Sequence, residues 1–414
     1  MKKEIKERIE MIRRGEVPKG YKRIKGEIIP EDWRISKLGE VALFKNGVPH
    51  ENYIHENGTY IVVNSKFISS EGKEFKCSNL NLSPLEKGDI AMVMSDVPNG
   101  KALAKCFLVD QNDKYTLNQR ICSIKAVEVD TNYLYYFLNR NKYFLRFDNG
   151  VGQTNLRKDE VLNCPVIQPT IGEQKTIAEI LSTWDKAIEL KEKLIEQKKE
   201  LKKGLMQKLL TGEVRLPGFK EEWKKIKLGK LIKELNERST KNNQYQILSV
   251  TKEGIIPQSE HFKKQVASKN NTGYKIVRRN NLVFSTMNLW MGSLDVLTSY
   301  DIGIVSPAYK VFRFEEEVFN PIFGKYFMKS EYMIRLYNKN SEQGASIVRR
   351  NLDLKGLLNE KILVPPYKEQ LEIASILNCI DKEIDLLEKE NEQIKKQKKG
   401  LMQLLLTGKV RVKV

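Results

Sequence analysis

EQKTIAEILSTWDKAIELKEKLIEQKKELKKGLMQKLLTG, the stretch Glu173–Gly212, returns later in the chain as EQLEIASILNCIDKEIDLLEKENEQIKKQKKGLMQLLLTG, Glu369–Gly408. Aligned without a gap, 25 of the 40 positions are identical. Unrelated segments would share roughly two or three, because each common residue type makes up under about a tenth of a typical chain. A repeat of this length decides the architecture and has to be identified before any fold is assigned.

Both copies predict one long helix. Apolar residues recur at alternating steps of four and three, which is the seam of a coiled coil, and Gly212 and Gly408 stand where a left-handed residue commonly ends a helix. At about 1.5 Å per residue, each helix would be roughly 60 Å long. Two similar seams in one chain predict that the helices pair antiparallel with each other; a solvated spacer helix is the alternative. The predicted pairing residues are Ile177, Leu181, Trp184, Ile188, Ile195, Leu205, Leu209, Ile373, Leu377, Ile380, Ile384, Leu387, Ile394, Leu401 and Leu405.

The repeat extends beyond the helices. Pro30–Val41 and Lys220–Leu231 open two corresponding segments, in which Trp33 matches Trp223. Between these openings and the helices, short β-rich runs alternate with Gly, Asn and Ser turns, which is typical of a compact mixed domain. Aromatic stripes at 132–145 and 322–337 predict helices that face a core rather than a base-stacking platform.

We therefore predict an α+β fold with a pseudo-two-fold internal repeat, in which two mixed α/β domains are separated by two long antiparallel helices. The predicted parts are a helical extension (1–25), a first mixed domain (26–170), a central long helix (171–216), a second mixed domain (217–365) and a C-terminal long helix (366–414).

Composition narrows the function. Lys and Arg total 72 against 53 Asp and Glu, giving a net charge of +19, which favours nucleic acid or another anionic surface as partner. Alternatively, the positive charge reflects a proteome that is rich in lysine and has no functional meaning. We see no run of 18 apolar residues and no signal-peptide core, so we expect an intracellular, cytoplasmic protein. The five cysteines form no C-x-x-C pair and the three histidines no ligand set, so we expect reduced thiols and no metal site.

The sequence lacks the enzyme motifs that we searched for. The sequence has no P-loop, no G-x-S-x-G and no H-E-x-x-H. Val364–Tyr367, VPPY, resembles the Asn/Asp-Pro-Pro-Tyr motif of amino-methyltransferases, but valine cannot accept hydrogen bonds from a target amino group. We therefore predict no catalytic residue.

Candidate DNA contacts are basic, amide and hydroxyl side chains on the loops of the mixed domains, since these groups match phosphates and the major-groove pattern of base edges. Candidates directed at phosphates are Lys101, Lys105, Arg157, Lys158, Lys263, Lys264, Arg278, Arg279, Arg349 and Arg350. Candidates that match base edges are Asn118, Gln119, Arg120, Gln153, Thr154, Asn155, Asn288, Tyr309, Gln343 and Ser346.

The repeated motifs resemble those of the DNA-specificity subunits of type I restriction-modification systems. The resemblance rests on N-L-R…L-N-C-P-V-I-Q-P…E-Q-K-T-I-A-E-I-L, its copy N-L-D-L…V-P-P…E-Q-L-E-I-A-S-I-L, and the endings G-L-M-Q-x-L-L-T-G-x-V-R. It covers nearly the whole chain apart from an N-terminal extension of roughly 25 residues. It implies a non-catalytic prokaryotic subunit whose two target-recognition domains each read half of a bipartite DNA site.

The same resemblance implies partners and a cofactor. The long helices would hold the domains apart and dock two modification subunits, which would bind S-adenosylmethionine, and restriction subunits would join them. The chain itself would bind double-stranded DNA and no cofactor. Two other hypotheses stay open: an enzyme with an unrecognised site, which needs a cofactor or metal motif, and a coiled-coil adaptor whose basic domains bind RNA or protein.

Overall fold

The computed structural model describes residues 3–251, 254–261, 270–343 and 350–413, and the chain divides into two compact units. Unit 1 comprises Met1–Leu190 and Asn391–Val414, and unit 2 comprises Lys191–Glu390. Each unit therefore contains one mixed domain and part of both long helices. Four predicted DNA contacts lie outside the described residues: Lys263, Lys264, Ser346 and Arg349.

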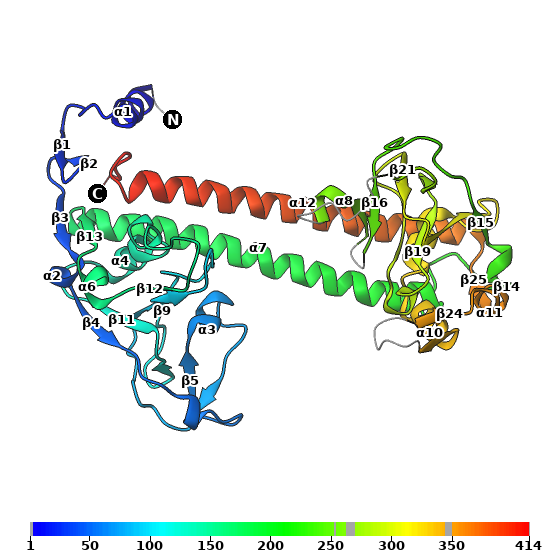
Figure 1. The fold of residues 1–414 in the computed structure, drawn as a ribbon, viewed down its shortest axis with the longest axis horizontal. Helices are drawn as coiled ribbons and strands as arrows, with labels where there is room; N and C mark the ends of the chain where they lie inside the picture. The colour runs from blue at the N-terminus through cyan, green and yellow to red at the C-terminus, as the bar shows by residue number, and fades with distance from the viewer. Residues whose placement is uncertain (1–2, 252–253, 262–269, 344–349, 414) are drawn as a thin grey trace. The chain divides into compact units, whose positions relative to one another are not determined.

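The two copies of the repeat form α7 (Ile171–Thr211) and α12 (Tyr367–Leu405) (Figure 1). Gly212 and Gly408, with φ of +73° and +72°, follow them in the left-handed conformation that a glycine adopts without steric cost. Ion pairs join the helices, and across each unit the residue numbers rise along one helix and fall along the other, so the contacts are antiparallel. They include Lys191–Glu390, Lys198–Glu383, Lys199–Glu388 and Lys202–Asp381 in unit 2, and Lys398–Asp185 in unit 1, where Arg411, beyond the end of α12, pairs with Glu173.

All the predicted seam residues are buried or half-buried. The buried ones are Ile177, Leu181, Ile195, Leu209, Ile373, Leu377, Ile384 and Leu405. The half-buried ones are Trp184, Ile188, Leu205, Ile380, Leu387, Ile394 and Leu401. Asn391 interrupts the seam and is also buried, and within the described residues its side-chain oxygen has no hydrogen-bond partner. A polar residue in an apolar seam lowers stability and fixes register.

Unit 1 begins with α1 (Lys3–Arg13) and an antiparallel hairpin of β1 (Tyr21–Ile24) and β2 (Glu27–Pro30). The predicted boundary at residue 25 therefore falls inside the hairpin turn. The body is a four-stranded sheet in the order β4-β11-β7-β9 beside a three-stranded sheet, β10-β5-β6. Their bounds are β4 Ala42–Asn46, β5 Tyr60–Val63, β6 Cys77–Ser78, β7 Ile90–Val93, β9 Cys106–Leu108, β10 Tyr115–Leu117 and β11 Ile121–Ala126. Short pairs add β3 (Arg34–Lys37) with β13 (Pro165–Gln168) and β8 (Ser95–Asp96) with β12 (Thr154–Asn155).

Unit 2 repeats this order of elements. Its four-stranded sheet is β15-β22-β19-β20, and three two-stranded pairs, β16-β17, β18-β21 and β14-β25, lie in the same unit. The bounds are β14 Lys224–Lys227, β15 Ile232–Leu235, β16 Leu248–Val250, β17 Ile255–Pro257, β18 Lys275–Arg278, β19 Leu282–Ser285, β20 Leu294–Val296, β21 Ile302–Val305, β22 Tyr309–Phe314 and β25 Lys361–Val364. A further pair, β23 (Ser341–Gln343) with β24 (Arg350–Leu352), flanks residues outside the described ranges.

The aromatic stripes form cores, as predicted. In unit 1 they lie on α4 (Thr131–Leu138) and α5 (Lys142–Leu145), where Tyr133 and Phe144 are fully buried. In unit 2 they lie on α9 (Pro321–Phe327) and α10 (Glu331–Lys339), where Phe323 and Phe327 stack on each other. Each stripe packs on the beginning of one long helix and the end of the other, so each mixed domain shares its core with both helices.

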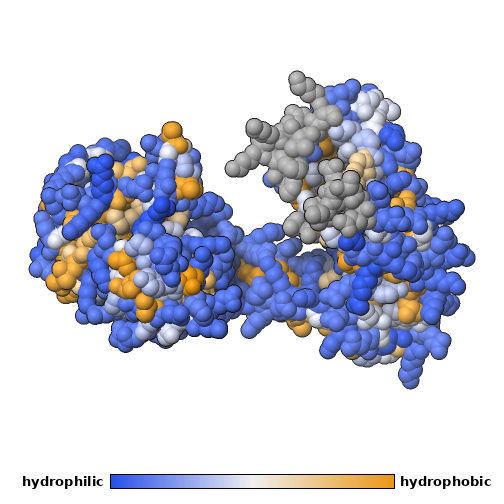
Figure 2. Space-filling view, turned by 60° about the horizontal axis from the view of Figure 1, so that its bottom comes forward, coloured by the Kyte–Doolittle hydropathy of each residue, from blue (hydrophilic) through white to orange (hydrophobic). Residues whose placement is uncertain are grey.

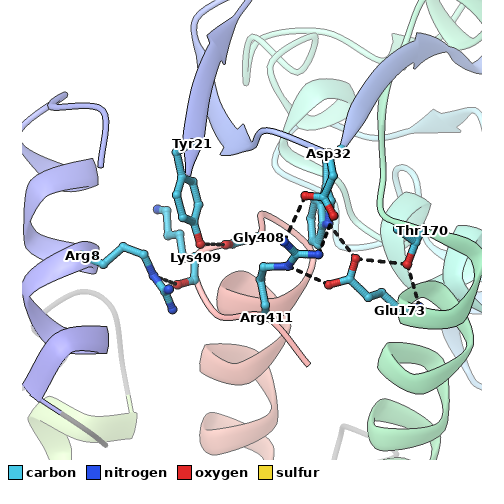
Figure 3. A network of polar contacts seen from close by, with 9 residues as sticks. Arg8, Tyr21, Asp32, Thr170, Glu173, Gly408, Lys409 and Arg411 are labelled. Carbon is cyan, nitrogen blue, oxygen red and sulfur yellow. Dashed lines mark hydrogen bonds and ion pairs between the residues drawn. The ribbon is translucent and has the colours of Figure 1, made fainter. Parts of the chain in front are cut away.

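A polar cluster joins distant parts of the chain within unit 1 (Figure 3). The Glu173 carboxylate accepts hydrogen bonds from Trp33 Nε1 at 2.9 Å and from Arg411 Nε at 2.9 Å. The Arg411 guanidinium also donates to both oxygens of Asp32, at 3.0 and 2.6 Å. Hydrogen bonds to Glu173 and then Asp32 raise the pKa of Arg411. The residues after α12 are thereby fastened to the strands at the start of the chain.

Candidate nucleic-acid interface

One end of the four-stranded sheet in unit 1 gathers the polar segments of that domain. The register pairs Asn46, the last residue of β4, with Cys122, and Val93, the last residue of β7, with Ile121, the first residue of β11. The turn 118–120 immediately precedes β11, and β12 pairs with β8 so that Asn155 lies opposite Ser95. Segments from four parts of the sequence therefore meet at one sheet end.

A hollow of about 320 Å³ lies at this sheet end. Its apolar floor is formed by Met94, Ile121 and Leu156, which are nearly or fully buried. Its rim is polar and consists of Asn46, Ser95, Arg120 and Asn155, beside Gly47. Glycine is required at position 47, since a Cβ there would lie 2.0 Å from the carbonyl oxygen of Asn118. This close approach fastens the β4 end to the turn before β11.

Hydrogen bonds hold the side chains of Ser95 and Asn155, whereas, in the part of the chain that the structure describes, the side chain of Arg120 is free to contact a ligand. Gln153 donates from Nε2 to Ser95 Oγ at 2.7 Å and to Asn155 Oδ1 at 3.4 Å. The backbone oxygen of Arg120 accepts from the Met94 amide at 2.9 Å, and Arg120 adopts a φ of +67°. Its side chain is exposed and has no ion-pair partner within the described residues.

Predicted basic residues flank the hollow. Arg157 lies two residues after the end of β12 and is exposed at the N-cap of α6 (Lys158–Leu162). Lys158 places its Nζ 5.8 Å from the ring centre of Phe44 on β4. Lys101 lies in the loop after β8, where the Asp96 carboxylate accepts hydrogen bonds from the amides of Ala102 and Leu103. Of the predicted contacts of this domain, Arg120 and Asn155 line the hollow itself.

Three predicted side chains of this domain are engaged elsewhere. Thr154 is buried, and its hydroxyl donates to Asp148 at 3.4 Å, so its prediction as a base contact is wrong. The reason is the alternation along β12, which turns Thr154 inward and leaves Asn155 exposed. Gln119 is exposed but donates to Glu51 at 2.6 Å, and Asn118 buries a side-chain oxygen that has no partner in the described part of the chain.

Unit 2 presents a corresponding sheet end with different residues. Tyr309 begins β22 opposite Ser285, the last residue of β19, and Asn288 follows shortly after. The backbone amide of Arg350 donates to the Met287 oxygen, and Gln343 pairs with Arg350 in the strand register. The Arg350 guanidinium lies 4.3 Å from the centre of the Trp290 ring and donates to Asn338 Oδ1 at 3.0 Å.

Arg278 and Arg279 lie away from this group, because they precede β19 whereas Asn288 follows it. Arg278 pairs with Glu237 at 2.7 Å and Arg279 with Asp301 at 2.8 Å. The structure therefore does not bring these two arginines together with Asn288, Tyr309 and Arg350.

Sequence reasoning missed Asn46 and Ser95 at the hollow and Trp290 beneath Arg350. The Asn-Gly turn at 46–47 and the Ser-Asp pair before Pro98 were visible signals, but only the sheet order shows that they meet. Trp290 had no periodic signal, because it lies in a three-residue 3₁₀ turn (Leu289–Met291).

The molecular surface is mostly hydrophilic on the face that Figure 2 shows. Hydrophobic residues form small separate patches on this face. Within the described ranges no helix is long and apolar enough to cross a membrane, and no group of three His, Cys, Asp or Glu residues there could hold a metal ion.

Comparison with known proteins identifies the domain type. Residues 30–200 match the model of the type I restriction modification DNA specificity domain. Residues 30–200 therefore resemble a type I DNA specificity domain. Over 95% of its length it is 26% identical to the type I restriction enzyme MjaVIII specificity subunit of Methanocaldococcus jannaschii, of which it covers 96%.

Solved specificity subunits share the fold. The S subunit of a type I system from M. genitalium aligns over 92% of this chain and 96% of its own, with 15% identity and a TM-score of 0.53. A chain from a structure concerned with assembly and conformational transition of the type I system aligns over 92% and 99%, with 16% identity and a TM-score of 0.56. These similarities agree with the resemblance to type I specificity subunits that the sequence motifs predict.

Proposed function

We propose that the chain is the DNA-specificity subunit of a type I restriction-modification complex and that its two mixed domains read the two halves of an asymmetric bipartite site. The observation that supports this most is the pair of corresponding sheet ends. Both present amide, hydroxyl and guanidinium groups, but Asn46, Arg120 and Asn155 in unit 1 have no identical counterparts among Asn288, Tyr309 and Arg350 in unit 2. Because the side chains at the two sheet ends differ, we expect the two DNA half-sites to differ in sequence.

The long helices support a role as spacer. With 41 residues in α7 and 39 in α12, each is roughly 60 Å long at about 1.5 Å per residue. We propose that they form a coiled coil that sets the spacing of half-sites about one DNA turn, roughly 34 Å, apart.

Equivalent exposed residues on the helices support the docking of two modification subunits. Leu190 on α7 and Leu386 on α12 occupy matching positions of the repeat, and they are 57% and 60% exposed. Leucines this exposed on a helix suit contact with a partner, and a duplicated surface suits two copies of one partner. In this proposal those subunits bind S-adenosylmethionine and transfer the methyl group, restriction subunits join the assembly, and this chain supplies the sequence specificity.

The experiment is to co-express the chain with modification subunits and map methylated sites genome-wide. We expect a split motif with two unlike halves. Exchanging residues 26–170 for the corresponding domain of another specificity subunit should change one half and leave the other. A matched exchange of 217–365 should change the opposite half. A motif that survives both exchanges would contradict the proposal.

A further inference from the structure

The hollow at the sheet end of unit 1 differs in its side chains from a phosphate-binding surface. Arg120 is the only basic residue on its rim, and the other polar groups there, Asn46, Ser95 and Asn155, are neutral. Its floor is apolar. Phosphate sites favour several cations or clustered backbone amides, whereas neutral donors and acceptors around one guanidinium match the edge of a base pair.

Arg120 is also held in an unusual way. A φ of +67° is uncommon for a residue other than glycine, asparagine or aspartate, and it carries a steric cost. Two contacts maintain the turn: the Met94 amide donates to the Arg120 oxygen, and Gly47 packs against the carbonyl of Asn118. Strained backbone of this kind concentrates at functional sites, where the surrounding structure compensates for the strain.

The charge of Arg120 is not neutralised nearby. No Asp or Glu lines the hollow, and within the described residues the guanidinium has no ion-pair partner. Three other candidate arginines differ: Arg278 and Arg279 are in ion pairs, and Arg350 lies over the ring of Trp290. An exposed guanidinium on a rigid turn retains all five N–H donors for a ligand.

We propose that Arg120 determines specificity by donating two hydrogen bonds to O6 and N7 of one guanine in the half-site read by unit 1. Asn155 and Asn46, on the rim of the same hollow, face the neighbouring base pair. The proposal rests on the DNA-reading function proposed above and adds the base and the residue that recognises it. The bidentate contact matches the fork of the guanidinium and is the commonest specific pairing of arginine with DNA.

The test uses the full chain in complex with its modification subunits and duplexes that contain the motif mapped for the unaltered protein. Each guanine is replaced in turn by 7-deazaguanine, which pairs normally but lacks the N7 acceptor. With the unaltered chain, we expect one guanine of the unit 1 half-site to lose about tenfold in affinity on replacement. With Arg120→Asn that position should become insensitive, while the guanines of the other half-site keep their response.

Asparagine is the substitute because it tolerates the left-handed backbone, so the turn is preserved. Arg120→Lys retains the charge but replaces the planar fork with a shorter, compact ammonium, and it should reduce the same guanine response without removing it. Arg157→Ala is the matched control: it removes an exposed arginine outside the hollow and should weaken binding to all duplexes alike, with the guanine response intact.

Two results would overturn the inference. In one, Arg120→Asn weakens every duplex equally and keeps all 7-deazaguanine effects, which is the behaviour of a phosphate contact. In the other, the unit 1 half-site contains no guanine. Both leave a split motif in place, so they are distinguishable from failure of the proposed function, in which the unaltered chain directs no split motif at all.

Discussion

The two units build the same cluster from differently connected pieces of chain. In unit 2, Arg215 donates to both oxygens of Glu369 at 2.7 Å, and Trp223 Nε1 donates to Glu369 at 3.1 Å. In unit 1, Arg411, Glu173 and Trp33 make the matching contacts. Arg215 and Trp223 are eight residues apart in one continuous segment, whereas Arg411 and Trp33 come from opposite ends of the sequence.

The residues after each long helix are attached to the tryptophan segment by side-chain contacts in both units, but the covalent chain joins the two directly in unit 2 alone. The helix-ending glycines follow the same rule: Gly212 packs on the Trp223 ring and Gly408 on the Trp33 ring. Unit 1 has additional contacts, since Arg411 also binds Asp32 and the Tyr21 hydroxyl donates to the Gly408 oxygen at 2.8 Å. Where the backbone does not hold the parts together, side chains supply more of the attachment.

Trp33→Ala should give the largest effect. Trp33 is fully buried, so its truncation should cost about 3–5 kcal/mol of local stability, whereas the half-buried Trp223 should cost less on the same change. Hydrogen exchange of the full chain, followed by mass spectrometry, measures both. We expect Trp33→Ala to expose the amides of residues 406–413 and Trp223→Ala to leave residues 213–222 closer to their original protection.

Peptides from the unaltered unit serve as the internal control in each variant. Equal losses of protection after the two substitutions would show that chain connectivity has no part in holding these segments.

How much the sequence could predict depends on the separation of the interacting residues. The long helices, their glycine ends and the aromatic cores follow from local periodicity, which a single segment contains. The contact of Arg411 with Glu173 spans 238 positions and depends on how the helices pair, so only the matching V-R after each T-G signalled it.

The candidate site shows the same limit. The residue types at 118–120 and 153–155 were sufficient to select them, but β12 has only two residues, too few for alternation to show that Thr154 points inward. Arg278 and Asn288 are equally plausible from sequence, and only the sheet shows that they belong to opposite ends of β19.

Replacing the central carboxylate of either cluster should lower stability by an intermediate amount, and the loss should be larger in unit 2 than in unit 1. Glu369→Gln removes the carboxylate charge beside Arg215, whose other acceptor is the neutral Glu221 backbone oxygen, whereas Glu173→Gln leaves Arg411 bound to the Asp32 carboxylate. We expect Glu369→Gln to cost about 1–3 kcal/mol and Glu173→Gln less, because the guanidinium of unit 1 keeps a charged partner. Chemical denaturation with exchange of unit-specific peptides tests the order. Adding Asp32→Asn to Glu173→Gln should remove the advantage of unit 1, and a double variant no worse than the single one would refute this explanation.

Tyr21→Phe should give the smallest effect and makes unit 1 more like unit 2. Phe219 has the same local setting as Tyr21, since a glycine with positive φ precedes each and each amide donates to the carbonyl three residues earlier. Loss of the hydroxyl should cost about 0.5–1.5 kcal/mol near neutral pH. Burial, the largest cause, raises the pKa of Tyr21 above 10.0. The protonated hydroxyl therefore stabilises the folded state fully below pH 10.0, and this contribution is lost as pH rises beyond that value. The stability difference between Tyr21→Phe and the unaltered chain should shrink in that range, and a difference that stays constant to higher pH would contradict the raised pKa of the buried hydroxyl.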